Sequence, residues 1–158
     1  MNVWITTVGS SPFAVINTLW AACELDDFVP ERIYFAYNDK MEHELEIVRK
    51  WIERIVKEYG GEVEVIEKKF VEEDFSGYSK LIKSMIIKEK TDGGAVAIDI
   101  TPGRKIMSAF SMFYGLLPDG ADRVYYLHLF DVKKYGNKSF CDIPADEHRL
   151  INMKEMVA

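Results

Sequence analysis

Short apolar segments rich in β-branched residues alternate with longer segments of helical periodicity, and this alternation constrains the fold more than any other feature of the chain. The predicted strands cover residues 2–8, 32–37, 62–66, 95–100 and 123–130. The predicted helices lie between them, one directly after residue 12 and the others over about residues 39–59, 75–90 and 102–117. Because the connections are short, this order predicts a parallel sheet joined by right-handed crossovers.

The expected fold class is α/β, a three-layer Rossmann-like architecture with a mostly parallel sheet and helices on both faces. We favour the strand order 3-2-1-4-5, and the flavodoxin-like order 2-1-3-4-5 is the alternative. Residues 138–143 are a candidate for an extra edge strand, followed by a bend at Pro144. We predict one domain over residues 1–158, with a core at about 1–130 and a C-terminal extension at 131–158.

The composition excludes several classes of protein. No apolar run approaches the roughly 18 residues of a membrane span, and the N-terminus lacks a signal-peptide pattern, so we expect a cytoplasmic protein without a membrane partner. The formal net charge of −6 disfavours duplex nucleic acid as a partner, because a duplex needs a basic face. Two distant cysteines predict neither a disulfide framework nor a metal site. The absence of glutamine and the many Glu, Lys and Ile residues favour a thermophilic source.

Two loops that follow strand ends are built alike, with a hydroxyl residue before a proline at a predicted helix start. Their residues are Gly9, Ser10, Ser11 and Pro12 in the first loop, and Thr101, Pro102 and Gly103 in the second. A hydroxyl at the N-cap and a proline behind it suit a helix start, while the remaining amides and the helix dipole suit a phosphate. Two ordinary helix caps are the alternative. In the favoured strand order, both loops flank the crevice where the order reverses.

Arg104 and Lys105 strengthen the phosphate interpretation, because the dipole disfavours cations in the first turn of a helix unless an anion lies there. Arginine can hold a phosphate bidentately, and lysine supplies a mobile point charge. Asp99 ends the preceding strand and either orients the loop or contacts a ribose hydroxyl. The sequence contains neither a G-x-G-x-x-G motif nor a phosphate-cradling lysine loop, so we expect no nicotinamide cofactor and no other cofactor.

Residues 99–108, Asp-Ile-Thr-Pro-Gly-Arg-Lys-Ile-Met-Ser, resemble the main signature of CARF (CRISPR-associated Rossmann fold) domains. Residues 7–12, Thr-Val-Gly-Ser-Ser-Pro, resemble the other ligand loop of that family, and the similarity covers about residues 1–130 in element order. The resemblance implies binding of a cyclic oligoadenylate, with cyclic tetra-adenylate favoured, across a homodimer. The implied ligand-binding residues are Gly9, Ser10, Ser11, Pro12, Asp99, Thr101, Pro102, Gly103, Arg104 and Lys105.

Most members of this family carry a fused effector, whereas some members, the ring nucleases, cleave the cyclic ligand and switch the signal off. The short chain leads us to expect a stand-alone ring nuclease, with a non-catalytic sensor domain, stand-alone or part of a longer effector, as the alternative. A Rossmann-like nucleotide-binding protein of another purpose is the third hypothesis.

In ring opening, the ligand's own 2′-hydroxyl attacks the adjacent phosphorus and leaves a 2′,3′-cyclic phosphate. The residues expected to take part are Lys105, which would stabilise the phosphorane, Ser11, which would position the phosphate or hydroxyl, and Arg104, which would hold a phosphate. Neither loop contains a histidine that could act as a base near neutral pH. We therefore expect slow, metal-independent turnover.

The predicted helix at residues 102–117 is apolar on nearly all sides. One side can cover the sheet while another meets a second copy, which suits a two-fold symmetric ligand. A helix that is simply well buried is the alternative.

Arg123 and His128 match the Arg-x4-His spacing of HEPN ribonuclease active sites. They fall on a predicted strand, where residues five apart point to opposite faces of the sheet. We therefore expect no catalytic role for this pair.

Overall fold

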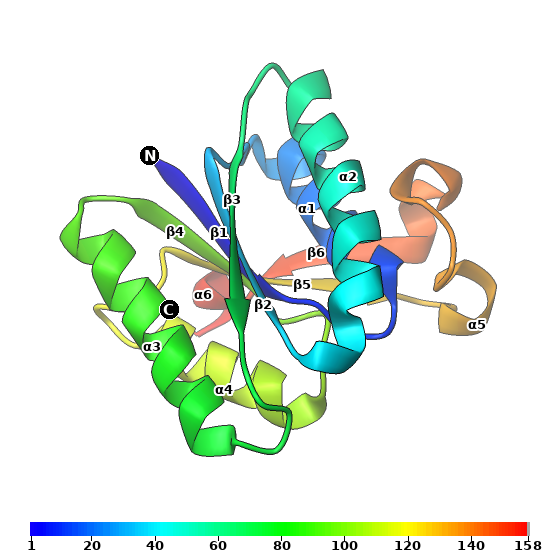
Figure 1. Cartoon of the computed structure of the whole chain (residues 1–158). Coiled ribbons are helices and arrows are strands. Elements are labelled where there is room, and N and C mark those ends of the chain that lie inside the picture. Colours follow the sequence, from blue (N-terminus) through cyan, green and yellow to red (C-terminus); the bar gives the residue numbers. More distant parts are fainter. Residues whose placement is uncertain (158) are drawn as a thin grey trace.

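Five parallel strands and one antiparallel edge strand form a single sheet in the computed structural model, which describes residues 1–157 (Figure 1). The strands are β1 (Asn2–Thr7), β2 (Arg32–Tyr37), β3 (Glu64–Lys69), β4 (Ala95–Asp99), β5 (Arg123–Leu129) and β6 (His148–Asn152). Their order is β3-β2-β1-β4-β5-β6, and only β6 runs antiparallel to its neighbour. The predicted order 3-2-1-4-5 is confirmed. The flavodoxin-like alternative is wrong, because β1 pairs with β2 on one side and β4 on the other.

Helices cover both faces of the sheet, and the alternation of side chains along the strands determines which residues meet which layer. The long helices are α1 (Pro12–Asp26) and α2 (Glu42–Glu58) on one face, and α3 (Phe75–Thr91) and α4 (Lys105–Leu116) on the other (Figure 1). On β1, Trp4 packs into the core beneath α1 and α2. Its neighbours Val3 and Ile5 face the opposite core, beneath α3 and α4.

The C-terminal extension packs on the sheet edge differently from the prediction. Residues 138–143 do not form a strand, because Phe140 turns inward against Trp20 and the chain forms the 3₁₀ turn η2 (Phe140–Asp142). The edge strand is β6, which follows Pro144. Short segments complete the extension: α5 (Val132–Tyr135), η3 (Ala145–Glu147) and α6 (Met153–Met156).

Two helix starts also differ from the prediction. The segment at residues 39–59 begins with the 3₁₀ turn η1 (Asp39–Met41), where the Asn38 side chain accepts a hydrogen bond from the Lys40 amide at 3.0 Å. The helix expected at residue 102 begins at Lys105 instead. Gly103 has a φ of +88°, a left-handed conformation that interrupts helical geometry before that point.

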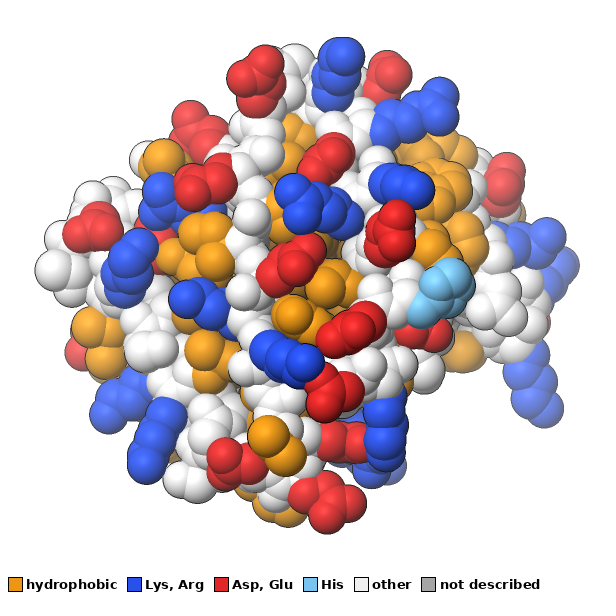
Figure 2. All heavy atoms as spheres, viewed as in Figure 1, with side chains coloured by type: hydrophobic (Ala, Val, Ile, Leu, Met, Phe, Trp, Pro, Cys, Tyr) orange, Lys and Arg blue, Asp and Glu red, His pale blue; other side chains and the backbone are white. Residues whose placement is uncertain are grey.

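The exposed edge strand β3 carries charged side chains that pair with their neighbours. Lys69 forms ion pairs with Asp39 and Glu42, and Glu67 accepts a hydrogen bond from Arg49 at 3.1 Å. Figure 2 shows basic and acidic side chains side by side on this face of the molecule, without a continuous basic patch. Such charges protect an edge strand from pairing with another chain.

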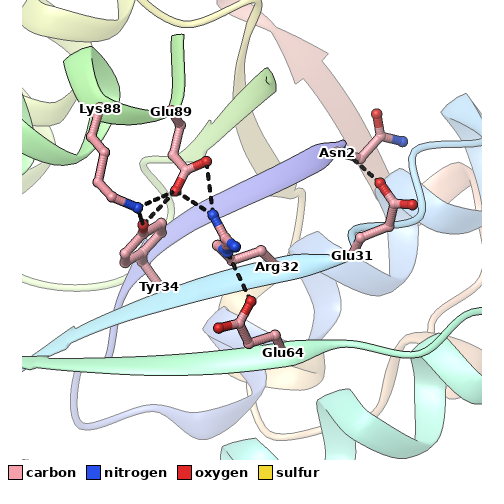
Figure 3. Close-up of polar contacts among 7 residues, drawn as sticks. All are labelled: Asn2, Glu31, Arg32, Tyr34, Glu64, Lys88 and Glu89. Atoms are coloured by element: carbon pink, nitrogen blue, oxygen red, sulfur yellow. Dashed lines mark hydrogen bonds and ion pairs between the residues drawn. The ribbon is translucent and has the colours of Figure 1, made fainter. Parts of the chain in front are cut away.

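A polar cluster ties the N-terminal ends of β2 and β3 to α3 (Figure 3). It lies away from the loops predicted to bind ligand, which follow the C-terminal ends of β1 and β4. The Arg32 guanidinium lies 2.9 Å from Glu89 and 2.9 Å from Glu64, and the Tyr34 hydroxyl donates to Glu89 at 2.5 Å. Burial alone would raise the pKa of Glu89, but hydrogen bonds from Tyr34 and Arg32 outweigh it and lower this pKa. Arg32 and Tyr34 therefore balance the negative charge of the buried Glu89 carboxylate, and the cluster has a structural role.

Candidate functional site

The two predicted loops meet at one cavity of about 370 Å³ at the C-terminal ends of β1 and β4. This is the point where the strand order reverses, the usual ligand position in an open parallel sheet. The lining residues are Val8, Gly9, Ser10, Ser11, Ala14, Asn38, Met41, Glu72, Thr101, Pro102, Gly103, Arg104 and Met107.

The two loops touch each other through their glycines. A Cβ atom added at Gly9 would lie 3.0 Å from the Gly103 nitrogen and 3.3 Å from its Cα, closer than an ordinary van der Waals contact. On the other side of the second loop, a Cβ at Gly103 would lie 3.3 Å from the Thr7 methyl group. Bare glycine backbone therefore forms part of the cavity wall, and a ligand can approach it closely.

Ser11 begins α1 as predicted, with extended backbone angles at the N-cap and Pro12 behind it. Its side chain makes no capping hydrogen bond. The Ser11 hydroxyl therefore remains available to the cavity that this residue lines. Pro12 itself does not line the cavity.

Thr101 does not cap α4, so that part of the prediction is wrong. Its hydroxyl accepts a hydrogen bond from the Leu127 amide at 3.0 Å, which ties the loop to β5, and the N-cap residue is Arg104. Asp99 lies beneath the loop, with 2% of its surface exposed, and accepts hydrogen bonds from the Thr101 amide at 2.9 Å and the Thr6 hydroxyl at 3.1 Å. Asp99 thus orients the loop. Its burial raises its pKa to about 7.

Several backbone amides around the cavity are free to bind an anion. Within residues 1–157, the amides of Gly9, Ser10, Gly103 and Arg104 donate no hydrogen bond to another part of the chain. Two of them precede the start of α1 and two precede the start of α4, where the helix dipoles add positive potential. This arrangement suits the oxygens of a phosphate group.

Three cations lie in or beside the loops. Arg104 lines the cavity and forms an ion pair with Glu72, whose other oxygen lies 2.8 Å from the Lys40 Nζ atom. Lys105 is exposed, lies outside the lining, and takes part in no ion pair within the described residues 1–157.

The structure therefore brings seven of the ten predicted residues to the cavity wall, and leaves Pro12, Asp99 and Lys105 behind or beside it.

Four residues at or beside the cavity were not predicted from the sequence: Asn38, Lys40, Met41 and Glu72. The first three follow β2 and Glu72 follows β3, so all four belong to the same C-terminal edge of the sheet as the predicted loops. The predicted strand order implied the position of the residues after β2, because the turn after the second strand must lie beside the loop after the first strand. No motif marks these residues.

A buried hydrogen-bond chain connects the site to α3 and α4. The Tyr78 hydroxyl lies 2.7 Å from the Thr7 hydroxyl and 2.9 Å from the Ser111 hydroxyl. A Cβ added at Gly103 would lie 3.3 Å from the Thr7 methyl group, so Thr7, which both helices hold in place, lies directly behind the second loop.

A larger cavity of about 760 Å³ lies elsewhere, between α1, α2 and the Phe140–Asp142 turn. Its lining residues are Trp20, Lys50, Trp51, Arg54, Ile55, Glu58, Tyr59 and Cys141. None of the predicted site residues belongs to it.

Arg123 and His128 lie on β5, as expected. Arg123 donates to the Tyr125 hydroxyl at 2.8 Å, whereas the His128 ring packs against Phe130 with centroids 4.9 Å apart. The two side chains have separate partners and form no shared site. Among residues 1–157, no group of three or more His, Cys, Asp or Glu side chains could hold a metal ion, and none of the helices is long and apolar enough to cross a bilayer.

The sequence model of the family described as CRISPR-associated protein (Cas_APE2256) matches residues 13–131, more than half of the chain. No curated protein sequence matches the chain. Among solved structures, Enterococcus italicus Csm6 bound to cyclic hexa-2′-fluoro-hexa-dAMP superposes with a TM-score of 0.64 at 15% sequence identity, over 99% of this chain. The chain spans 42% of the length of that Csm6 chain. The protein described here belongs to the CRISPR-associated family Cas_APE2256, and its predicted resemblance to CARF domains is confirmed.

Proposed function

We propose that this protein binds a cyclic oligoadenylate, with cyclic tetra-adenylate favoured, in the cavity formed by the two loops. The contact of Gly9 with Gly103 carries the proposal, because it joins free amides from two helix starts into one anion-binding surface. Ser11 and Arg104 add a hydroxyl and a guanidinium to that surface. The Csm6 structure of the same fold is bound to a cyclic oligonucleotide analogue, which supports this ligand class.

The ligand would lie between two copies of the chain. Cyclic tetra-adenylate has four phosphates and two-fold symmetry, so a two-fold dimer would present each loop to it twice. α4 begins at the site and exposes Phe113 at 60% and Ile106 at 38% of their surfaces. These exposures contradict the alternative that this helix is buried on all sides. The exposed apolar side of α4 suits contact with a second copy of the chain.

Bound in this way, the ring would open without a metal ion. The 2′-oxygen of one adenosine forms a bond to the adjacent phosphorus, and the bond from that phosphorus to the 5′-oxygen of the next nucleotide breaks. The proton of the 2′-hydroxyl passes through solvent to the departing 5′-oxygen. The products are linear, with a 2′,3′-cyclic phosphate at one end and a 5′-hydroxyl at the other.

The chain would contribute geometry and positive charge to this step. Arg104 would hold a phosphate, and the uncapped Ser11 hydroxyl would position the phosphate or the attacking hydroxyl. Lys105, which is free of ion pairs among the described residues, would turn towards the ligand and stabilise the negative charge of the phosphorane. Cleavage would remove the signalling ligand of type III CRISPR defence.

Lys105→Ala separates binding from cleavage. We expect the rate of ring opening to fall by about 10²–10³, because one well-placed charge donor is lost, while the Kd for cyclic tetra-adenylate changes by less than about tenfold. The matched control is Lys83→Ala on the exposed side of α3, which should cleave like the unaltered protein. Single-turnover kinetics and calorimetric titration measure the two quantities.

The other outcomes identify the alternatives. Undiminished cleavage by Lys105→Ala would remove this residue from the mechanism. Tight binding without cleavage by the unaltered protein would make the chain a sensor, and absence of binding would overturn the proposed ligand.

A further inference from the structure

We propose that Glu72 is an internal competitor for the anion site: its carboxylate holds Lys40 and Arg104 in the free protein, and a ligand phosphate replaces it. The identity of the natural ligand rests on the function proposed above, but the competition itself applies to any anion that enters the cavity. Lys40 thereby becomes a second cation that contacts the ligand.

The position of Glu72 is that of a bound anion. Its side chain is only 15% exposed and lines the same cavity as the free loop amides. Each carboxylate oxygen pairs with a cation from a different loop: one lies 2.8 Å from the Lys40 Nζ atom after β2, and the other pairs with Arg104 before α4. A phosphate that bridges these loops would need the same two partners.

The charges make simultaneous occupation unfavourable. The hydrogen bond from Lys40 and the charge of Arg104 hold the pKa of Glu72 below its usual range, so this side chain is ionised at neutral pH. Arginine and lysine form charge-assisted hydrogen bonds with both carboxylate and phosphate oxygens. A phosphodiester carries one negative charge, as Glu72 does, and two such anions on the same cations repel one another.

The segment that carries Glu72 is a short, largely exposed connection. Glu72 lies in the connection between β3 and α3, beside Val71, which is 71% exposed, and the exposed Glu73. The connection is fixed at its ends by the buried Phe70 and by Asp74, whose side chain accepts a hydrogen bond from the Gly77 amide at 2.9 Å. Glu72 can therefore leave the cavity while α3 keeps its cap.

The test compares Glu72→Gln with Glu73→Gln, its exposed neighbour, which has the same change of charge. Tripolyphosphate serves as the probe because it contains neither base nor ring, and calorimetry measures its Kd. We expect Glu72→Gln to bind it at least about tenfold more tightly than the unaltered protein, a gain of about 1.4 kcal/mol, and Glu73→Gln to bind it like the unaltered protein. Adding Lys40→Met to Glu72→Gln should reverse the gain.

Equal Kd values for Glu72→Gln and Glu73→Gln, weaker binding by Glu72→Gln, or no binding by any of the proteins would each overturn the proposal. Glu72→Ala repeats the test without the amide, and circular dichroism verifies that each variant is folded. Titration with cyclic tetra-adenylate separates the two proposals. A tighter tripolyphosphate complex in Glu72→Gln without binding of the cyclic ligand would leave the competition intact and contradict the proposed function.

Discussion

At the scale of residues, two carboxylates beside the loops have pKa values shifted in opposite directions by different causes. Burial raises the pKa of Asp99 to about 7, although it accepts hydrogen bonds from Thr101 and Thr6. The Lys40 ammonium lowers the pKa of Glu72, which lies near the surface. Asp99 therefore supports the backbone of the second loop, whereas Glu72 supplies charge to the cavity.

The raised pKa of Asp99 makes stability depend on pH. Between about pH 4 and about pH 7 the folded protein holds this proton more tightly than the unfolded chain, so Asp99 lowers stability as pH rises, by at most about 1.4 kcal/mol per pH unit. Asp99→Asn carries no such proton. We expect the free energy of unfolding in urea of Asp99→Asn, relative to the unaltered protein, to increase from about pH 5 to about pH 7. Parallel pH profiles would contradict the shift.

At the scale of elements, the sequence predicted the strand order and both loops because hydrophobic periodicity and short connections are strong signals. It misplaced the start of α4, since a Thr-Pro-Gly sequence fits a helix cap and a turn equally well, and only the contact of Thr101 with Leu127 decides between them. It also missed β6, whose sequence His-Arg-Leu-Ile-Asn lacks strand alternation and pairs with β5 only through the tertiary fold.

The loop between β4 and α4 provides a test with a matched control. Gly103→Ala and Gly93→Ala both place an alanine at a positive φ, +88° and +80°, so each should lose about 1–2 kcal/mol of stability. A Cβ at Gly93 meets nothing within 4 Å, whereas a Cβ at Gly103 would lie 3.3 Å from the Thr7 methyl group, closer than an ordinary contact, and would shift the loop. We therefore expect only Gly103→Ala to weaken the binding of cyclic tetra-adenylate in calorimetry. Unchanged affinity in Gly103→Ala would remove this loop from the site.

At the scale of the whole molecule, a chain with a net charge of −6 places Arg104 and free backbone amides at one small cavity, with Lys40 and Lys105 beside it. The sequence indicated a local basic site through the neighbouring Arg104 and Lys105. The contribution of Lys40 and Glu72 could not be predicted, because it depends on how four separate connections come together at one sheet edge. The exposed apolar side of α4 begins at the same edge. Ligand binding and association of two copies are thus expected to share one surface.

Phe113→Glu tests that association. A charge at the exposed Phe113 side chain would be buried in the proposed interface. In size-exclusion chromatography with light scattering, we therefore expect a monomer for Phe113→Glu and a dimer for the unaltered protein. Ile87→Glu introduces the same charge at a side chain on α3 that is 52% exposed, and should remain dimeric. A dimeric Phe113→Glu protein would place the interface elsewhere.

The most direct test of the proposed cleavage is a single-turnover reaction in which the protein is in excess over cyclic tetra-adenylate and EDTA is present, with products resolved by liquid chromatography and mass detection. We predict linear products that end in a 2′,3′-cyclic phosphate and a 5′-hydroxyl. An intact ring that elutes with the protein, or cleavage that requires an added divalent ion, would contradict metal-independent ring opening.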